Sequence, residues 1–241
     1  MADGGFIGRV IIVTGAGGNL GRAVTERLLT AGARVLGLVR RAEEVGTPEQ
    51  ALAGIAGGRF AARAAELSNE PAVDAAFEQA AQMGTLWGVV NAAGAWDGGK
   101  TVAQSSVSSF EKMIDANLRS VFLTSRAAMQ RLPANGGGRI VNVSAYIAQT
   151  GAGGHGNAAY AAAKAGVIAL TRALAEEGAK DGVRANCIAP STIATPDNAA
   201  AMPKADQTKW VPLASVVDAC VYLCAPESDG VNGAVLTLPT R

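Results

Sequence analysis

The sequence predicts an α/β fold built on a parallel sheet, and three features near its start lead to this prediction. Residues 10–13 form an unbroken apolar run, as in a strand that is buried on both faces of a parallel sheet. Residues 15–18 include three glycines, which allow a turn with backbone angles that a side chain would forbid. After the turn, apolar residues recur every four positions, which predicts a helix from about Asn19; they are Leu20, Val24 and Leu28.

Strands and helices continue to alternate along the rest of the chain. Apolar runs predict further strands at 34–39, 60–65, 86–90, 139–143, 183–188 and 234–238. Helical periodicity predicts helices at 71–83, 110–132, 158–175 and 216–224. The connection 43–58 has room for a short helix, 144–157 is expected to be a glycine-rich loop, and 194–210 an irregular polar segment. Since no repeat or second domain is visible, residues 1–241 are expected to form one domain.

Composition and charge exclude several classes of protein. The chain is 49% hydrophobic and 17% charged, and its 21 basic and 20 acidic side chains leave a net charge of +1. This balance provides no basic stripe for nucleic acid and no polybasic anchor for a membrane surface. The first residues lack the pattern of a secretory signal, and no apolar run approaches the roughly 18 residues of a membrane span. We therefore expect a cytoplasmic protein that binds neither nucleic acid nor membranes.

No metal centre is expected from the histidine and cysteine content. His155 is the only histidine, and three cysteines indicate no disulfide framework. Cys220 and Cys224 lie four residues apart on a predicted helix. They serve there either as buried small side chains or, in the alternative interpretation, as a pair of metal ligands.

The strand, glycine turn and helix of residues 9–21 together make an anion site. Backbone N–H groups at a helix N-terminus have no intrahelical partners, and together with the helix dipole they attract a phosphate. The missing side chains of the turn let a pyrophosphate approach the backbone. Because a strand and a helix flank the turn, we expect dinucleotide binding here, through Gly15, Gly17, Gly18, Asn19 and Leu20.

The end of the second predicted strand bears on the choice of dinucleotide. A protein selective for NAD usually places an acid here to bind the ribose 2′-hydroxyl, whereas an arginine suits the 2′-phosphate of NADP. This sequence has Val39, Arg40 and Arg41, with no acid before Glu43. We therefore expect NADPH to be preferred over NADH, with Arg40 as the contact. The alternative is a pair of solvated arginines at the start of a loop.

Two further features are candidates for a role in ligand binding, one at the end of a predicted strand and one on a predicted helix. Asn91-Ala92-Ala93-Gly94 ends a predicted strand, and such small residues let the backbone lie against a flat cofactor. An ordinary strand-ending turn has the same composition. Asn117 is polar on an apolar helical stripe, which is typical of a satisfied structural asparagine and compatible with a functional one.

Tyr160 and Lys164 stand four residues apart on the predicted helix 158–175, so they share one face and can touch. A free tyrosine has a pKa of about 10 and needs help to act as an acid near neutral pH. A neighbouring ammonium stabilises the phenolate and lowers that pKa. The pair is therefore a candidate for proton transfer, while a common helix-surface pair is the alternative.

Five of these features occur in the order that is typical of one enzyme family. They are Thr14-Gly15…Gly21, Asn91-Ala92-Ala93-Gly94, Asn117, Tyr160-x-x-x-Lys164 and Pro190-Ser191-Thr192-Ile193-Ala194-Thr195. With them the chain resembles the short-chain dehydrogenase/reductase family over essentially its whole length. The resemblance implies a Rossmann-like, doubly wound parallel sheet of about seven strands with helices on both faces. It also implies NAD(P) along the carboxyl edge of the sheet, a small-molecule substrate, and a homodimer or homotetramer.

The resemblance also assigns roles to individual residues. Tyr160 would be the general acid, and Lys164 would lower its pKa and contact the ribose. Asn117 would support a water that leads to Lys164. Glu66 and Leu67 match the adenine-contacting position, although the family more often has Asp than Glu there. Further cofactor contacts would come from the small-residue turn and from the turn after the sixth strand, at Asn91, Ala92, Ala93, Gly94, Pro190, Ile193 and Thr195.

The chain departs from the family pattern at two positions. Asn19 stands where the family usually has the middle glycine of its loop. Ala145 stands where the family has its catalytic serine, and Ser144 is one residue early. Neighbours on a strand point to opposite faces, so either a bulge rotates Ser144 into the site or the serine is absent. Ser144 is therefore kept among the catalytic candidates.

The missing serine has a precedent in dihydropteridine reductase, which this chain resembles at residues 95–99 and 195–213. We expect an NADPH-dependent oxidoreductase that reduces a carbonyl or a conjugated C=N or quinonoid group, with Tyr160 as general acid. The alternatives are a dihydropteridine reductase-like enzyme and a weakly catalytic NADP-binding sensor or scaffold. The identity of the substrate and the direction of the reaction do not follow from the sequence.

The segment 194–212 is expected to be a lid over the substrate pocket. It follows the sixth strand at the ligand-binding edge, it is rich in proline and small residues, and Met202 and Trp210 provide apolar anchors. A static surface loop is the alternative.

Overall fold

The computed structural model describes residues 5–240, and its centre is a parallel sheet of seven strands in the order β3-β2-β1-β4-β5-β6-β9. Every neighbouring pair in this sheet is parallel. The strands are β1 (Arg9–Thr14), β2 (Arg34–Val39), β3 (Phe60–Ala64), β4 (Thr85–Asn91), β5 (Gly138–Val143), β6 (Val183–Pro190) and β9 (Val235–Leu238). The predicted doubly wound α/β fold is confirmed.

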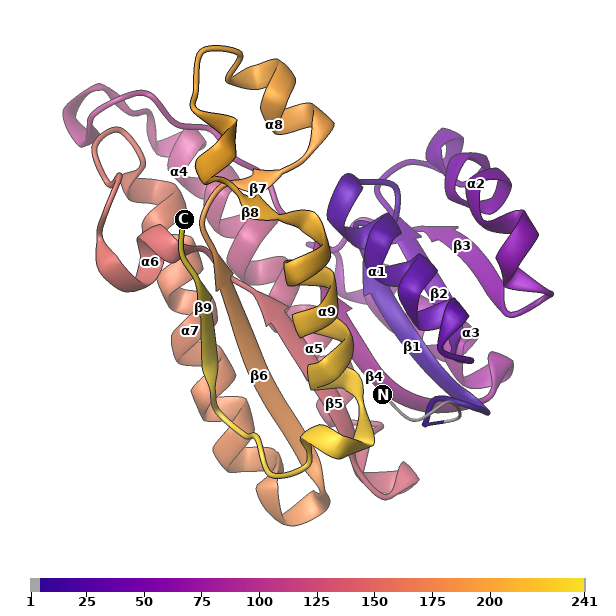
Figure 1. The fold of residues 1–241 in the computed structure, drawn as a ribbon. Helices are drawn as coiled ribbons and strands as arrows, with labels where there is room; N and C mark the ends of the chain where they lie inside the picture. The colour runs from indigo at the N-terminus through magenta and orange to yellow at the C-terminus, as the bar shows by residue number, and fades with distance from the viewer. Residues whose placement is uncertain (1–4, 241) are drawn as a thin grey trace.

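Helices cover both faces of this sheet (Figure 1). One apolar cluster joins the sheet to α1 (Asn19–Thr30), α2 (Gly46–Ala56) and α9 (Leu213–Cys224). A second cluster on the other face joins it to α3 (Glu70–Met83), α5 (Ser120–Met129) and α7 (Ala158–Gly178). The central strands are buried on both faces, which explains why their sequences are continuous apolar runs.

The direction of strand order reverses between β1 and β4, because β2 and β3 lie on one side and β5, β6 and β9 on the other. Open α/β sheets bind ligands at such a switch point, beyond the carboxyl ends of the strands. The glycine turn after β1 and the Asn91–Gly94 turn after β4 both lie at this point. The fold therefore brings the two turns together, and Ala93 N donates a hydrogen bond to Thr14 Oγ1 although the two residues are 79 positions apart in the sequence.

Three predicted segments differ from the structure. The predicted helix 110–132 is two helices, α4 (Val107–Ile114) and α5, joined by a π-helical turn at Asp115–Arg119. The expected loop 144–157 contains a short helix, α6 (Tyr146–Thr150). The expected irregular segment 194–210 contains α8 (Pro196–Ala201), which begins with Thr195 as its cap and a proline in its first turn.

The ends of the 194–212 segment lie side by side. The short strands β7 (Ile193–Ala194) and β8 (Val211–Pro212) pair in parallel, and Val211 N donates to Thr192 O at 2.8 Å. Between them the chain carries α8 out beyond the carboxyl ends of the main strands (Figure 1). Trp210 is buried just before β8, and Met202, which follows α8, is 38% exposed.

One helical stretch, Ala158–Asp181, which contains α7, is long and apolar enough to cross a membrane by length and composition alone. Its length and apolar composition also suit a core helix, and Val167, Thr171, Leu174 and Ala175 are buried in the described chain. Only 39% of the most apolar 18 residues of this helix is buried, so one side of the helix packs against the sheet and the other side is exposed.

The buried interpretation of Cys220 and Cys224 agrees with the structure. Both thiols are free and fully buried in α9, as is Cys187 in β6. Burial raises the pKa of Cys220 to about 12, and it raises the pKa of Cys224 as well. These thiols therefore stay protonated and pack as small apolar side chains.

Candidate active site

The glycine turn adopts a conformation in which side chains would interfere. Gly15 has φ of 70°, and a Cβ atom there would lie 3.0 Å from Cα of Ala93. A Cβ atom on Gly21 would fall on the carbonyl oxygen of Gly15. The turn thus packs the start of α1 tightly against the ends of β1 and β4, which only glycine allows at these two positions.

The N-terminus of α1 is open to an anion. Gly18 occupies the N-cap position, and within residues 5–240 no side chain caps this end and no acid lies in the first turn of α1. Gly17 and Gly18 are exposed, and Leu20 is half-buried against the core. The N–H groups at this end therefore remain available, and the site fits the pyrophosphate of a dinucleotide.

The turn after β4 is tied to β1 and to the sheet interior by different residues. Thr14 Oγ1 accepts a hydrogen bond from Ala93 N at 3.0 Å. The Asn91 side chain is buried, donates to Asn142 Oδ1 at 2.8 Å and accepts from Thr124 Oγ1 at 2.7 Å. The Asn91 side chain thus connects β4, β5 and α5, which leaves its backbone and the small residues 92–94 to line the switch point.

The two arginines after β2 have different surroundings. Arg41 Nε donates to Glu44 Oε1 at 2.6 Å, and the same nitrogen lies 3.4 Å from Glu43 Oε1. The Arg40 guanidinium is exposed and makes no ion pair or hydrogen bond with any residue of the described chain. Arg40 is therefore free to bind an added anion, whereas Arg41 is held by its own acidic neighbours.

The segment after β3 provides an exposed carboxylate and a half-buried apolar side chain. Glu66 Oε1 accepts hydrogen bonds from the backbone N and the Oγ of Ser68. Leu67 is half-buried and packs against the second apolar cluster. Both residues follow β3, which β2 separates from β1 and its glycine turn, and they lie at the same end of the sheet.

The π-helical turn between α4 and α5 positions Asn117. Its side chain is fully buried, with Nδ2 donating to Ala95 O at 2.9 Å and to Met113 O at 3.0 Å, while Oδ1 accepts from Ala95 N. A Cβ atom on Gly94 would lie 2.8 Å from Asn117 Oδ1 and 3.3 Å from Lys164 Nζ. Asn117 thus holds the chain just after β4 close to Lys164. Insertions of this kind in helices are frequent at functional sites.

Tyr160 and Lys164 lie in the first two turns of α7, and the Lys164 Nζ is 5.9 Å from the centroid of the Tyr160 ring. The Lys164 ammonium is buried and donates to Val143 O at 2.8 Å. Burial lowers the pKa of Lys164 to about 8 and raises the pKa of Tyr160 to about 12. The direction for the pKa of Tyr160 is opposite to the expected one, and its cause is desolvation of the phenol by burial.

Ser144 does not reach the site through a bulge. The pairing of β5 with β6 is regular, and Ser144 N continues it by donating to Ile188 O at 2.8 Å. The Ser144 hydroxyl is buried and donates to the backbone carbonyl of Lys164 at 2.7 Å. The Ser144 hydroxyl thus secures the start of α7 to the end of β5.

Two contacts at the carboxyl end of the sheet could not be found from the sequence. Asn19 Nδ2 donates to Asp197 Oδ2 at 2.6 Å, across 178 residues of chain. Trp96 Nε1 donates to Asn157 Oδ1 at 2.9 Å, which joins the loop after β4 to the loop before α7. Neither pair has a local sequence signal, since each depends on loops that only the fold brings together. Pro190, Ile193 and Thr195 lie at the base of the segment that carries Asp197.

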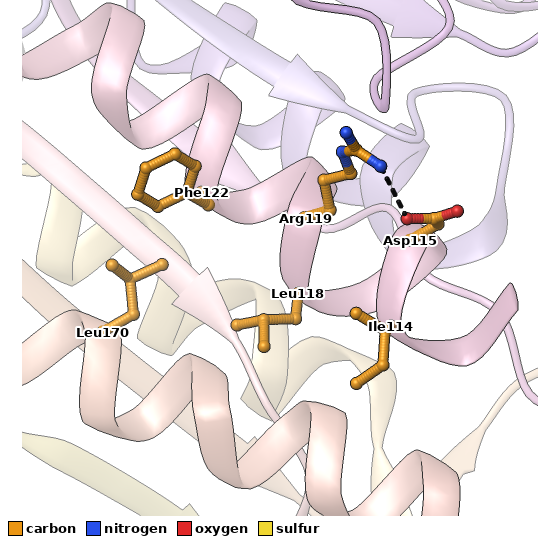
Figure 2. Close-up of a pocket in the computed structure, with 6 residues that line it drawn as sticks. All are labelled: Ile114, Asp115, Leu118, Arg119, Phe122 and Leu170. Carbon is orange, nitrogen blue, oxygen red and sulfur yellow. Dashed lines mark hydrogen bonds and ion pairs between the residues drawn. The ribbon is translucent and has the colours of Figure 1, made fainter. Parts of the chain in front are cut away.

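An open apolar groove of about 450 Å³ lies between α7 and the π-helical turn with the adjoining ends of α4 and α5 (Figure 2). Its floor and walls are Ile114, Leu118, Phe122 and Leu170. An ion pair between Arg119 Nη1 and Asp115 Oδ1, at 3.3 Å, lies at the same groove. The lining includes none of the candidate catalytic residues.

Comparison with known proteins agrees with the arrangement of these residues. A family model described as short chain dehydrogenase matches residues 9–206. The chain is 33% identical over 249 residues to (3R)-3-hydroxyacyl-CoA dehydrogenase of Mus musculus, covering 92% of each chain. It is 33% identical over 190 residues to acetoacetyl-CoA reductase of Acinetobacter sp. (strain RA3849), covering 78% of this chain and 75% of that one.

A solved structure shares the whole fold. The crystal structure of levodione reductase superposes with a TM-score of 0.90 at 26% identity, covering 97% of both chains. The family match includes the glycine turn, the Asn91–Gly94 turn, Asn117 and the Tyr160–Lys164 pair. This chain is an oxidoreductase that belongs to the short-chain dehydrogenase/reductase family, whose members bind NAD(P) and act on small molecules.

Proposed function

We propose that this enzyme uses NADPH to reduce a carbonyl, or a conjugated C=N or quinonoid group, of a small molecule, with Tyr160 donating the proton. The observation that carries the proposal is the meeting of Tyr160 and Lys164 with Gly94 and Asn117 at the switch point of the sheet. The bound cofactor would supply hydride, and the protein would position and polarise the acceptor.

The roles of the chain's own groups follow from their contacts. Tyr160 carries the O–H group that can be given to the acceptor, and Lys164 lies one helical turn further on, where its ammonium can stabilise the phenolate that remains. Asn117 positions the backbone after β4 next to that ammonium. The Ser144 hydroxyl is occupied by the Lys164 carbonyl, so the site offers one donor fewer to the developing negative charge.

The proposal is tested by following NADPH oxidation with simple ketones, quinones and quinonoid pterins. Turnover of carbonyl or quinonoid acceptors supports it. A preference for quinonoid pterins alone selects the second candidate, a dihydropteridine reductase-like activity, which Ala145 and the resemblance at 195–213 favour. Tight NADPH binding without oxidation by any class would contradict both and leave a sensor or scaffold.

NADPH is expected to bind more tightly than NADH because Arg40 has no competing partner in the described chain. A charge-assisted contact to the 2′-phosphate contributes roughly 1.5–3 kcal/mol, or about tenfold to a hundredfold in affinity. Dissociation constants for both cofactors should show Arg40→Ala weakening NADPH only. Arg41→Ala is the matched control and should change less, since Glu44 holds Arg41. Equal affinities for the two cofactors in the wild type would overturn this expectation.

We also propose that residues 194–212 act as a lid on one catalytic unit formed by the whole chain. The paired strands β7 and β8 provide a hinge base, and α8 is the part beyond the sheet edge. The apolar Met202 is partly exposed on this segment, and the buried Trp210 fastens its end. The lids of enzymes are typically loop segments of this kind, which move about hinge residues at their ends.

A homodimer through the outer face of α5 and α7 is our proposal for the assembly. Phe122 lines the groove and is 49% exposed, and the exposed residues of α7 include Ala158, Ala162, Ala165, Ala169 and Ala173. Alanines let helices approach closely, and the groove carries both Asp115 and Arg119, so a two-fold copy can pair opposite charges. A partner on this outer face of α5 and α7 would cover the exposed apolar side of α7, whose most apolar 18 residues are only 39% buried.

Light scattering on a sizing column tests the dimer. The wild-type mass should be twice the 24.3 kDa of the chain, and Phe122→Glu should give monomers because it places a charge in the apolar groove. The control is Tyr222→Glu, which changes a similarly exposed aromatic residue of α9 on the opposite face of the sheet. A monomeric wild type, or a dimer that Phe122→Glu leaves intact, would exclude this interface.

A further inference from the structure

We propose that Asn19 and Asp197 form a latch between the glycine turn and the 194–212 segment, and that Asp197 thereby limits the affinity of the enzyme for its dinucleotide. Asn19 is the first residue of α1, and its Nδ2 donates to Asp197 Oδ2 at 2.6 Å. Asp197 lies in the first turn of α8, beyond the end of β7. The inference rests on the proposed cofactor site at the N-terminus of α1.

The latch depends on the departure of Asn19 from the family pattern. A glycine at this position has no side chain and could not hold Asp197, so the contact exists because the chain has asparagine here. Helix N-termini attract anions, and in this structure the anion that Asn19 brings to the first turn of α1 is a carboxylate. Within residues 5–240, Asp197 has no Lys or Arg within salt-bridge distance, so its charge is not offset by an ion pair.

Two anions at one helix N-terminus repel each other. The N–H groups at the end of α1 have no side-chain cap, so the pyrophosphate of a dinucleotide would bind there, beside the carboxylate that Asn19 holds. Binding of the cofactor therefore either breaks the contact between Asn19 and Asp197 or brings like charges together. In both cases the 194–212 segment and the cofactor are coupled, so that the latch lowers cofactor affinity and speeds release.

Cofactor affinity gives the first test. Asp197→Asn keeps the size of the side chain and removes its charge, and it should tighten NADPH binding about fivefold at low salt, with a smaller effect at high salt because exposed charges are screened. The control is Asp206→Asn, which removes the other aspartate of the segment; that residue contacts only Thr208 and Lys209. Equal changes for the two variants, or no change for Asp197→Asn, would overturn the proposal.

Proteolysis without cofactor gives the second test. Trypsin cleavage at Lys204 and Lys209 reports how often the segment opens, since both lysines lie on it. Asn19→Ala and Asp197→Ala should each accelerate cleavage, and the double variant should be no faster than either single one, because both remove one contact. Additive acceleration would show that the two residues act separately and that no latch exists.

The two arms also separate this inference from the proposed function. A wild type that binds neither NADPH nor NADH would contradict the proposed cofactor use, and the proteolysis experiment would still decide whether the latch exists. A wild type that binds NADPH, with unchanged affinity in Asp197→Asn and additive cleavage in the double variant, would leave the proposed function intact and exclude the latch.

Discussion

Tyr160→Phe is expected to lower kcat about 10²- to 10⁴-fold, the range that positioned acid–base groups contribute. The variant keeps the ring and removes only the hydroxyl, so the packing at the start of α7 should be preserved. NADPH affinity should stay within a few-fold of the wild type, which separates loss of chemistry from loss of binding. In the wild type, kcat should fall as pH rises through about 8, because the buried Lys164 ammonium loses its proton there.

The matched control for this experiment is Ser144→Ala. The Ser144 hydroxyl is buried on the Lys164 carbonyl, so its removal should cost about 1 kcal/mol of stability and leave kcat nearly unchanged. If Ser144→Ala proved as damaging as Tyr160→Phe, Ser144 would have to be the catalytic serine, and the assignment of proton transfer to Tyr160 without a serine would be wrong.

Ala145→Ser is expected to raise kcat for simple ketones about 10- to 100-fold, because one positioned donor to a developing oxyanion is worth roughly 10²- to 10³-fold and an introduced serine should recover part of that effect. Ala145 has extended backbone angles, φ of −151° and ψ of 150°, so its side chain points to the face opposite that of Ser144. The Ser144 side chain points toward α7, where its hydroxyl donates to the backbone carbonyl of Lys164. A serine at 145 should therefore place a hydroxyl where the resemblance to the family leads us to expect one.

Quinonoid acceptors provide the internal control for that variant. Their developing charge spreads over a conjugated system, so they need the extra donor less and should be reduced at similar rates by the wild type and by Ala145→Ser. Steady-state kinetics with both acceptor classes measures the difference. Equal effects on ketones and quinonoid acceptors, or no gain with ketones, would show that position 145 does not face the reacting group.

The strands were predictable from sequence because a parallel sheet buries both faces of each strand and leaves continuous apolar runs. The run at Arg34–Val39 matches β2 residue for residue. Helices were predictable where one stripe is apolar, but the π-helical turn at Asp115–Arg119 was not, since it preserves the apolar composition and only shifts the phase of the helix. Short helices such as α6 and α8 leave too few residues for a period to appear.

The candidate site was predictable where it depends on spacing along one element. Tyr160 and Lys164 share a face because α7 is a helix, and the opposite orientations of Ser144 and Ala145 follow from strand alternation. The contact between Asn19 and Asp197 was not predictable, because it joins loops that lie far apart in the chain. The raised pKa of Tyr160 also required the structure, since it depends on how deeply the phenol is buried.

The most direct measurement of the central claim is a single-turnover reaction with NADPH that carries deuterium at both C4 positions of the nicotinamide. With a ketone acceptor, the wild type should transfer deuterium to the carbinol carbon of the product, where it does not exchange with water, and Tyr160→Phe should bind the same cofactor but transfer it at least about a hundredfold more slowly. Deuterium in the product at equal rates for both proteins would contradict the role of Tyr160. A wild type that binds NADPH and oxidises it with no acceptor class would contradict the proposed reaction itself.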